Sequence, residues 1–368
     1  MQNTDSISDS RKKRISNRNL APVGIIFALL GLLLFGYFVK KAGLAEIIAG
    51  IGRLGAAFVL ILAISTIRQI VRSIAWMKCF EPPFRLRFRD ALAARIMGDA
   101  LGNIVPLASV AISEPSKAVF VKDRVPLMVG LSALAVEDIF YGLSIAIFVF
   151  SGTATLLLTF PLPKALRYGS LGALTMTLVI MPLGYFVIRR KWKILSGTLS
   201  LLGTRGIAHD WMTKMTARAE TLEHRIYGFY ERNQASFLSI FLLELAFHFA
   251  GVVEIYTTLS YISPIAPTLL TAFILESVNR IINVLFKFVP LRTGVDEAGT
   301  GLLSKVLGFT TTIGVTLAIV RKGRDIFWSA IGVALLLYKG ISLRHLGEDA
   351  AESVKEASST PKTVVISE

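Results

Sequence analysis

Long apolar segments recur along the whole chain and leave little room for a soluble domain. The first, residues 20–39, has about the 20 residues that an α-helix needs to cross a hydrocarbon core of roughly 30 Å. Of the 368 residues, 53% are hydrophobic and only 18% are charged, values that soluble domains of this length rarely reach. The sequence therefore predicts an all-α, polytopic transmembrane helix bundle of about eight spans. The others are predicted at residues 56–80, 125–150, 168–188, 235–262, 268–289, 307–320 and 326–338.

Both ends of the chain are polar. Residues 1–19 contain four consecutive basic residues, and the apolar run that follows is too long for the hydrophobic part of a signal peptide. We therefore expect a retained first span. The predicted organisation is a basic cytoplasmic N-terminus (1–19), a transmembrane domain (20–343) and a disordered cytoplasmic tail (344–368) rich in Ser, Glu, Lys and Ala.

Basic residues gather at the ends of the apolar runs, although the formal net charge of +15 could suggest nucleic acid. Nucleic-acid binding needs a basic stripe on a folded soluble face, so we exclude this partner. Following the spans from a cytoplasmic N-terminus places the clusters at 85–89, 117–124 and 189–193 in the cytoplasm and 321–324 in an outer loop. This bias predicts a bacterial cytoplasmic (inner) membrane protein with both termini cytoplasmic. The long connection 189–233 is expected to lie as an amphipathic segment on the cytoplasmic surface.

Two segments combine a Val-Pro-Leu sequence with a glutamate seven or eight residues beyond the proline: Pro106 with Glu114, and Pro290 with Glu297. Proline interrupts an apolar helix, and paired breaks in two halves of a membrane protein point to a site built from half-helices. We predict two proline-broken, re-entrant segments that line a cavity; an ordinary proline kink plus an interfacial loop is the alternative. The predicted spans place four crossings between the breaks, and hence both breaks on the cytoplasmic face, whereas an inverted repeat needs an odd number.

Ionisable residues lie inside the predicted spans, where each costs about 2.5 to 3.5 kcal/mol on the insertion scale. One interpretation is structural: Glu276 pairs with Arg280 on its own helix, and Arg72 pairs with Glu137 or Glu244. The other is that basic side chains near the breaks hold a phosphate headgroup, which suits the planar guanidinium, while carboxylates orient them. The remaining members of the set are Arg68, Asp138, His248, Glu254 and Asn279.

Signatures of other chemistry are weak. The single cysteine, Cys79, and the four scattered histidines show no metal-ligand spacing. Serines near the first break have no histidine or lysine in a recognisable dyad, and no glycine-rich phosphate-binding loop occurs. We therefore expect no enzymatic activity, no metal and no cofactor.

The order and spacing of short motifs resemble the flippase-like transmembrane domain of the lysylphosphatidylglycerol synthase family over roughly residues 68–337. The chain departs from the family pattern at Lys117 and Asp138, where arginine is usual, and offers only Gly294 where paired glycines are usual. The motifs lie at residues 72–76, 102–106, 114–118, 135–138, 290–297 and 320–321.

The resemblance implies a lipid-handling bundle, here expected as a stand-alone member without the soluble aminoacyltransferase domain. We predict that it binds and translocates a phospholipid or other amphipathic lipid, with an anionic or zwitterionic headgroup, between leaflets. Alternatives are a membrane-embedded enzyme or accessory subunit of a lipid or lipid-linked glycan pathway, and a scaffold whose buried charges are only structural. A homodimer or a lipid-biosynthesis enzyme is the expected protein partner.

The predicted binding residues fall into three groups. At the mouth of the cavity they are Asn103, Glu114, Lys117, Arg292 and Glu297; deeper inside, Arg72, Glu137 and Arg280; and at the breaks, Pro106, Pro290 and Gly294.

Overall fold

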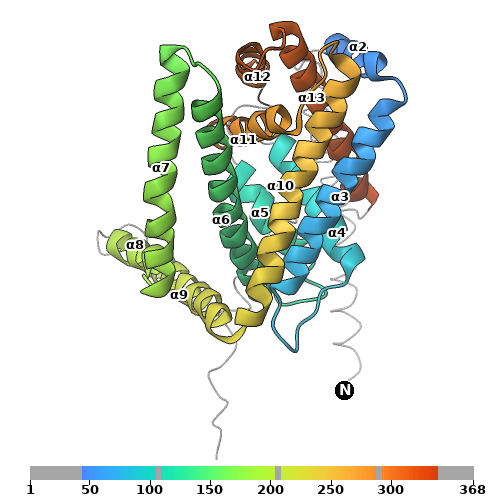
Figure 1. Cartoon of the computed structure of the whole chain (residues 1–368). Coiled ribbons are helices and arrows are strands. Elements are labelled where there is room, and N and C mark those ends of the chain that lie inside the picture. Colours follow the sequence, from blue (N-terminus) through green and yellow to red (C-terminus); the bar gives the residue numbers. More distant parts are fainter. Residues whose placement is uncertain (1–43, 105–108, 204–208, 287–291, 293, 339–368) are drawn as a thin grey trace, which may run out of the picture.

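The computed structural model describes residues 44–104, 109–203, 209–286, 292 and 294–338. Within these residues the chain forms α-helices and their connections, and no β-strand (Figure 1). The predicted all-α class is therefore confirmed. The predicted first span and both polar ends of the chain lie outside the described residues.

Four long apolar helices form the tall body of the molecule in Figure 1. Each is long and apolar enough to cross a membrane: α3 (Ala57–Lys78), α6 (Leu127–Thr159), α7 (Lys164–Arg189) and α10 (Gln234–Ile262). Helices α6 and α7 begin directly after Pro126 and Pro163, because the fixed φ of proline suits a helix start. These helices confirm the spans predicted from the apolar runs at 56–80, 125–150, 168–188 and 235–262.

The last helix, α13 (Thr311–Tyr338), is continuous over 28 residues. The prediction of two short spans with an outer loop at 321–324 is therefore wrong. Arg321 and Lys322 lie in the middle of α13 and are 4% and 1% exposed. Lys322 pairs with Glu297, and Arg321 donates a hydrogen bond to the Thr300 hydroxyl, so the helix continues through these polar contacts.

The first predicted break separates α4 (Phe88–Ile104) from α5 (Ser109–Val119), which pack against each other. The start of α4 and the end of α5 belong to one core cluster. This cluster also includes Trp76 near the end of α3 and Ile240 near the start of α10. The segment therefore enters the bundle and returns to the same end. We call α4 and α5 the first hairpin.

The second predicted break separates α11 (Leu269–Leu285) from α12 (Val295–Val306). The start of α11 and the end of α12 lie in another core cluster, together with Leu259 near the end of α10 and Phe309 just before α13. We call α11 and α12 the second hairpin. Residues 268–289 are thus one arm of a hairpin followed by its break, and the prediction of a full span there is wrong.

The two hairpins enter the bundle from opposite ends. Among the described helices between them, α6, α7 and α10 are those that run the length of the bundle. The predicted four crossings, with both breaks on one face, are therefore wrong because α11 turns back. Three crossings is the odd number that an inverted arrangement of two halves requires.

Helix α13 packs against both hairpins through glycines. A Cβ added at Gly314 would lie 2.5 Å from the Thr300 backbone oxygen of α12, and one at Gly332 would lie 2.5 Å from the Ile96 oxygen of α4. Any side chain at these positions would push the helices apart. The two glycines therefore fix α13 as the element that joins the hairpins.

The predicted amphipathic connection 189–233 forms two helices, α8 (Ile194–Gly203) and α9 (His209–Arg232). At the start of α8, the Glu223 carboxylate of α9 accepts a 2.8 Å hydrogen bond from the Leu195 backbone N–H. Phe229 of α9 belongs to the core cluster at the open end of the first hairpin, so α9 lies across that end (Figure 1). The short helix α2 (Leu44–Leu54) lies at the other end, next to α13.

Candidate functional site

A cavity of 540 Å³ lies between the two hairpins and helices α3, α6, α10 and α13. This volume is in the range of small-molecule sites. Opposite charges nearly balance in the lining: seven arginines face six carboxylates. The arginines are Arg68, Arg72, Arg95, Arg280, Arg292, Arg321 and Arg324, and the carboxylates are Asp99, Glu114, Asp138, Glu276, Asp296 and Asp325.

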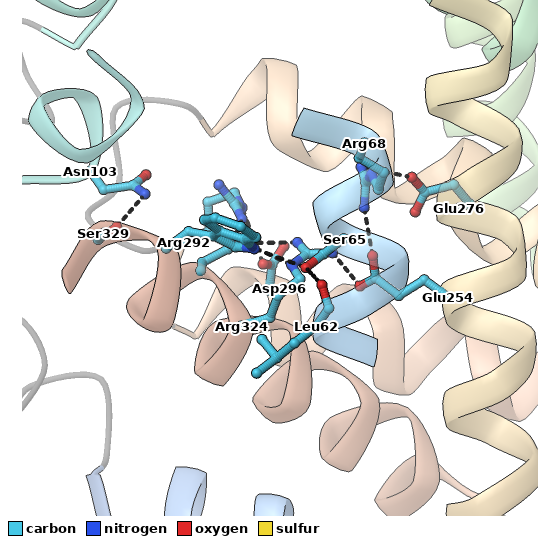
Figure 2. A network of polar contacts seen from close by, with 12 residues as sticks. Leu62, Ser65, Arg68, Asn103, Glu254, Glu276, Arg292, Asp296, Arg324 and Ser329 are labelled. Atoms are coloured by element: carbon cyan, nitrogen blue, oxygen red, sulfur yellow. Dashed lines mark hydrogen bonds and ion pairs between the residues drawn. The ribbon is translucent and has the colours of Figure 1, made fainter. Parts of the chain in front are cut away.

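Arginines of three helices converge on two glutamates at one side of the cavity, and Figure 2 shows Arg68 and Arg324 beside these glutamates. Arg68 of α3 lies 2.9 Å from Glu254 and 3.5 Å from Glu276. Arg324 of α13 also pairs with Glu254, and Arg280 pairs with Glu276 one helical turn away, which confirms that predicted pairing. Arg324 also pairs with Asp325, so the three arginines face three carboxylates on this side of the cavity.

Arg292 stands at the turn of the second hairpin, in the left-handed region at φ +49°. Its guanidinium lies 3.1 Å from Asp296 and 3.0 Å from Asp325 of α13, contacts that hold an otherwise unfavourable backbone conformation. Next to it, Gly294 has φ +85° and donates its N–H to the Glu297 carboxylate at 2.8 Å. This capping contact starts α12 and aims its first turn at the cavity.

The first hairpin holds a lysine in its interior. The Lys117 side chain is fully buried, and its ammonium lies 2.9 Å from Glu114 and 3.0 Å from Asp99. The two carboxylates reach the cavity, with side chains 26% and 39% exposed. At the end of α4, Asn103 donates a 2.9 Å hydrogen bond to Ser329 of α13 (Figure 2).

Arg72 of α3 contacts three carboxylates. It lies 2.7 Å from Glu137, 3.5 Å from Asp138 and 3.5 Å from Glu244, so the predicted pairing of Arg72 is confirmed with both glutamates. Arg95 of the first hairpin shares Glu137 at 3.0 Å. This cluster, Arg72, Arg95, Glu137, Asp138 and Glu244, is called the acidic cluster below because its carboxyl groups outnumber its arginines.

Aromatic rings orient three of the arginines. The guanidinium carbons of Arg68 and Arg280 lie 4.6 Å and 4.9 Å from the ring centre of Phe247. That of Arg72 lies 4.2 Å from the Tyr141 ring. Cation–π contact fixes the guanidinium planes without consuming their N–H donors, which bind the carboxylates named above.

The sequence model of one protein family, described as the lysylphosphatidylglycerol synthase TM region, matches residues 21–332. The chain belongs to this family. The match takes in both hairpins and the cavity between them, so the cavity is a feature of the lysylphosphatidylglycerol synthase TM region of this chain. No curated protein and no solved structure matches the chain. Together with the four apolar helices, the family makes this an integral, multi-pass membrane protein.

Five of the predicted binding residues line the cavity in this lysylphosphatidylglycerol synthase TM region: Arg72, Asn103, Glu114, Arg280 and Arg292. Their role in binding remains a prediction.

The other predicted residues lie elsewhere. Lys117 and Glu137 are fully buried behind the lining, where they neutralise lining residues. Gly294 and Glu297 start α12. The expected position of Lys117 and Glu297 at the mouth therefore differs from the structure. Pro106 and Pro290 lie outside the described residues.

Sequence reasoning missed several lining residues, including Arg95, Asp99, Arg321, Arg324 and Asp325. Arg321 and Arg324 were assigned to a loop because charges usually end an apolar run. A usable signal was the spacing of Arg321 and Asp325, which places opposite charges one helical turn apart. Arg95 and Asp99 are likewise four residues apart, on a segment that has too few apolar residues for a span.

Among the described residues, no group of three or more His, Cys, Asp or Glu side chains converges as a metal site. Four of the six lining carboxylates, Asp138, Glu276, Asp296 and Asp325, pair with arginines, and Glu114 pairs with Lys117. Asp99 shares that same lysine. The absence of a cofactor and of enzymatic activity remains a prediction.

Proposed function

We propose that this protein binds the headgroup of a phospholipid, or of another amphipathic lipid with a phosphate, in the cavity between the hairpins and moves it between leaflets. The observation that carries the proposal is a 540 Å³ charged cavity bounded by hairpins that enter from opposite ends. A purely structural bundle has no need of so many costly charges around an open volume.

The arginine-rich side supplies the phosphate site. Arg68, Arg292 and Arg324 are each 11% to 22% exposed at the side chain, and a guanidinium can offer two parallel N–H donors to phosphate oxygens. Their present partners are carboxylates, which a phosphate can replace without leaving the cation unpaired. The acyl chains stay in lipid, because the cavity has the size of a headgroup site only.

The opposite side suits a cationic group next to the phosphate. Asp99, Glu114 and Asp138 present partly exposed carboxylates to the cavity. The separation of arginines on one side from accessible carboxylates on the other favours a zwitterionic headgroup over a purely anionic one. We place the protein in the bacterial cytoplasmic membrane with both termini in the cytoplasm, with a homodimer or a lipid-biosynthesis enzyme as its protein partner.

The test is lipid transfer in proteoliposomes. Purified protein is reconstituted with a trace of fluorescent phosphatidylethanolamine or phosphatidylglycerol, and an impermeant reductant reports the rate at which inner-leaflet probe reaches the outside. We expect transfer by the wild type, and at least a tenfold loss in Arg292→Lys, which keeps the charge and loses the planar fork.

The matched control is Arg232→Gln, which removes an arginine paired with Glu81 at 2.9 Å outside the cavity. Transfer by this variant should equal that of the wild type. Equal rates in wild type, Arg292→Lys and protein-free vesicles would reject the proposal in favour of the scaffold.

A further inference from the structure

The acidic cluster contains one carboxyl group that the arginines do not satisfy. Glu137 accepts hydrogen bonds from Arg72 at 2.9 Å and Arg95 at 3.0 Å. Glu244 of α10 is fully buried, and neither of its oxygens has a hydrogen-bond partner among the described residues. The ion pair that the described part of the chain provides for Glu244, with Arg72, is long at 3.5 Å. A fully buried carboxylate without hydrogen bonds is costly unless it is protonated.

The neighbouring charges do not supply the missing cation. Arg72 and Arg95 face the three carboxyl groups of Glu137, Asp138 and Glu244, which leaves one negative charge in excess. From α5, Lys117 is engaged by Asp99 and Glu114. On α10 itself, His248 lies one turn away and is bonded to Ser144, and the Tyr141 ring of α6 covers Arg72.

Glu137 and Glu244 can share a proton. Both contact Arg72, Glu137 at 2.7 Å and Glu244 at 3.5 Å, so the two carboxyl groups flank one guanidinium. The second oxygen of Glu137 is also buried without a partner. One proton placed between these oxygens would satisfy both groups and cancel the excess charge.

We propose that Glu244, with Glu137, holds one exchangeable proton that binds together with the lipid headgroup. This inference rests on the proposed function. Arg72 links the two events, because it lines the cavity and also contacts Glu244. A phosphate that draws the Arg72 guanidinium toward the cavity removes positive charge from Glu244, whose carboxylate then takes up a proton to become a neutral carboxylic acid.

Asp138 can relay the proton between the cavity and the acidic cluster. Its side chain is 39% exposed, lines the cavity and lies 3.5 Å from Arg72. Because binding free energies are reciprocal, a lipid that favours the proton must itself bind more tightly when the proton is present. Movement of the loaded site between leaflets would carry the proton along, so a proton gradient could drive the lipid.

The experiment uses the full chain in proteoliposomes containing fluorescent phosphatidylethanolamine, with pH varied equally on both sides and then as a gradient. In wild type we expect transfer at limiting lipid to change up to tenfold per pH unit, the slope for one linked proton, and to respond to the direction of the gradient. Glu244→Gln, a neutral stand-in for the protonated side chain, should transfer lipid at a rate independent of both.

Glu223→Gln is the matched control, since Glu223 is a buried carboxylate between α8 and α9, outside the cavity; it should keep the wild-type pH dependence. Wild-type transfer that ignores pH and gradient would overturn this inference and leave the proposed function intact. Absence of any wild-type transfer would overturn both.

If Glu244→Gln does not fold, wild-type protein in nanodiscs decides the matter. A pH dye in weak buffer should record uptake of about one proton per short-chain phosphatidylethanolamine bound. Binding without proton uptake would overturn the inference.

Discussion

The two hairpins hold their charges in opposite ways. In the first, the cation Lys117 is fully buried and its carboxylate partners Asp99 and Glu114 face the cavity. In the second, the carboxylate Asp296 is 2% exposed while its partner Arg292 is 22% exposed and faces the cavity. Each hairpin pairs its charges internally, so the charge that it presents to the cavity depends on which partner is buried. The comparison explains how a nearly neutral cavity acquires an acidic side and a basic side.

Loss of the buried lysine is expected to have the largest effect. Lys117→Ala leaves Asp99 and Glu114 without their cation, and breaking a buried pair in this way costs about 3 to 5 kcal/mol. Yield and thermal stability in detergent, followed by fluorescence-detected gel filtration, should fall sharply. Lys193→Ala, at an exposed pair with Glu220, is the control and should behave like wild type. A stable Lys117→Ala would mean that the first hairpin does not depend on its buried cation.

The second largest loss of stability is expected from variants that force α13 away from either hairpin. Gly314→Ala acts on the second hairpin and Gly332→Ala on the first, and overpacking of this kind costs about 1 to 3 kcal/mol. Both variants should lose thermal stability. Gly142→Ala on α6, where an added Cβ meets nothing within 4 Å, should not. Unchanged melting of both variants would contradict the close approach of α13.

The lipid selectivity should depend on which side of the cavity is altered. Asp99→Asn removes the more exposed carboxylate of the first hairpin and leaves Glu114 to pair with Lys117, and we expect the preference for phosphatidylethanolamine over phosphatidylglycerol to fall about tenfold, or 1.4 kcal/mol. Native mass spectrometry with mixed lipids measures the ratio. Arg292→Lys should weaken both lipids alike, and the same ratio in every variant would show that the two sides do not discriminate.

The contact between Asn103 of the first hairpin and Ser329 of α13 is expected to matter less. Asn103→Ala removes one hydrogen bond and should cost about 1 kcal/mol, seen as a small fall in melting temperature. Ser329→Ala should produce a fall of similar size, and the double variant should be no worse than either alone. Additive losses would argue that the two side chains act separately.

The smallest effect on stability is predicted for an exposed ion pair outside the hairpins. Lys191 lies 2.5 Å from Glu231 and holds the pKa of this exposed carboxyl below its usual value. A lowered carboxyl pKa adds stability that is present above the usual value and is lost as the pH falls through the lowered one. Because the pair is exposed to solvent, its contribution is small, so Glu231→Gln should melt only slightly below wild type at pH 7, and this difference should disappear at a pH below the lowered pKa, as measured by the same assay. A clear loss at pH 7 would show that surface pairs matter more than the buried ones suggest.

The sequence predicted the long apolar helices well and the charged ones poorly. Helices such as α6 and α10 follow from uninterrupted apolar runs, whose length and periodicity are local properties. Helix α13 was divided in two because the neutralising partners of its charges, Glu254 and Glu297, are far away in the chain. The turn of α11 was missed for a related reason, since hydropathy does not tell whether a helix of 17 residues crosses or returns.

The candidate site was predictable only in part. Proline breaks and charges within spans pointed to Arg72, Asn103, Glu114, Arg280 and Arg292, which do line the cavity. Which member of each ion pair faces the cavity depends on tertiary packing, and Lys117 is the clearest example. Its position near a break suggested a ligand contact, whereas the structure buries it completely.

The central claim is that the cavity between the hairpins holds a lipid headgroup. The most direct test is native mass spectrometry of the purified wild type, with extraction and identification of bound lipid, beside an Arg68→Gln, Arg292→Gln double variant and the Arg232→Gln control. The account predicts one phosphate-bearing lipid class on wild type and control, and its loss from the double variant. No selective lipid on the wild type, or the same lipid retained by a folded double variant, would contradict it.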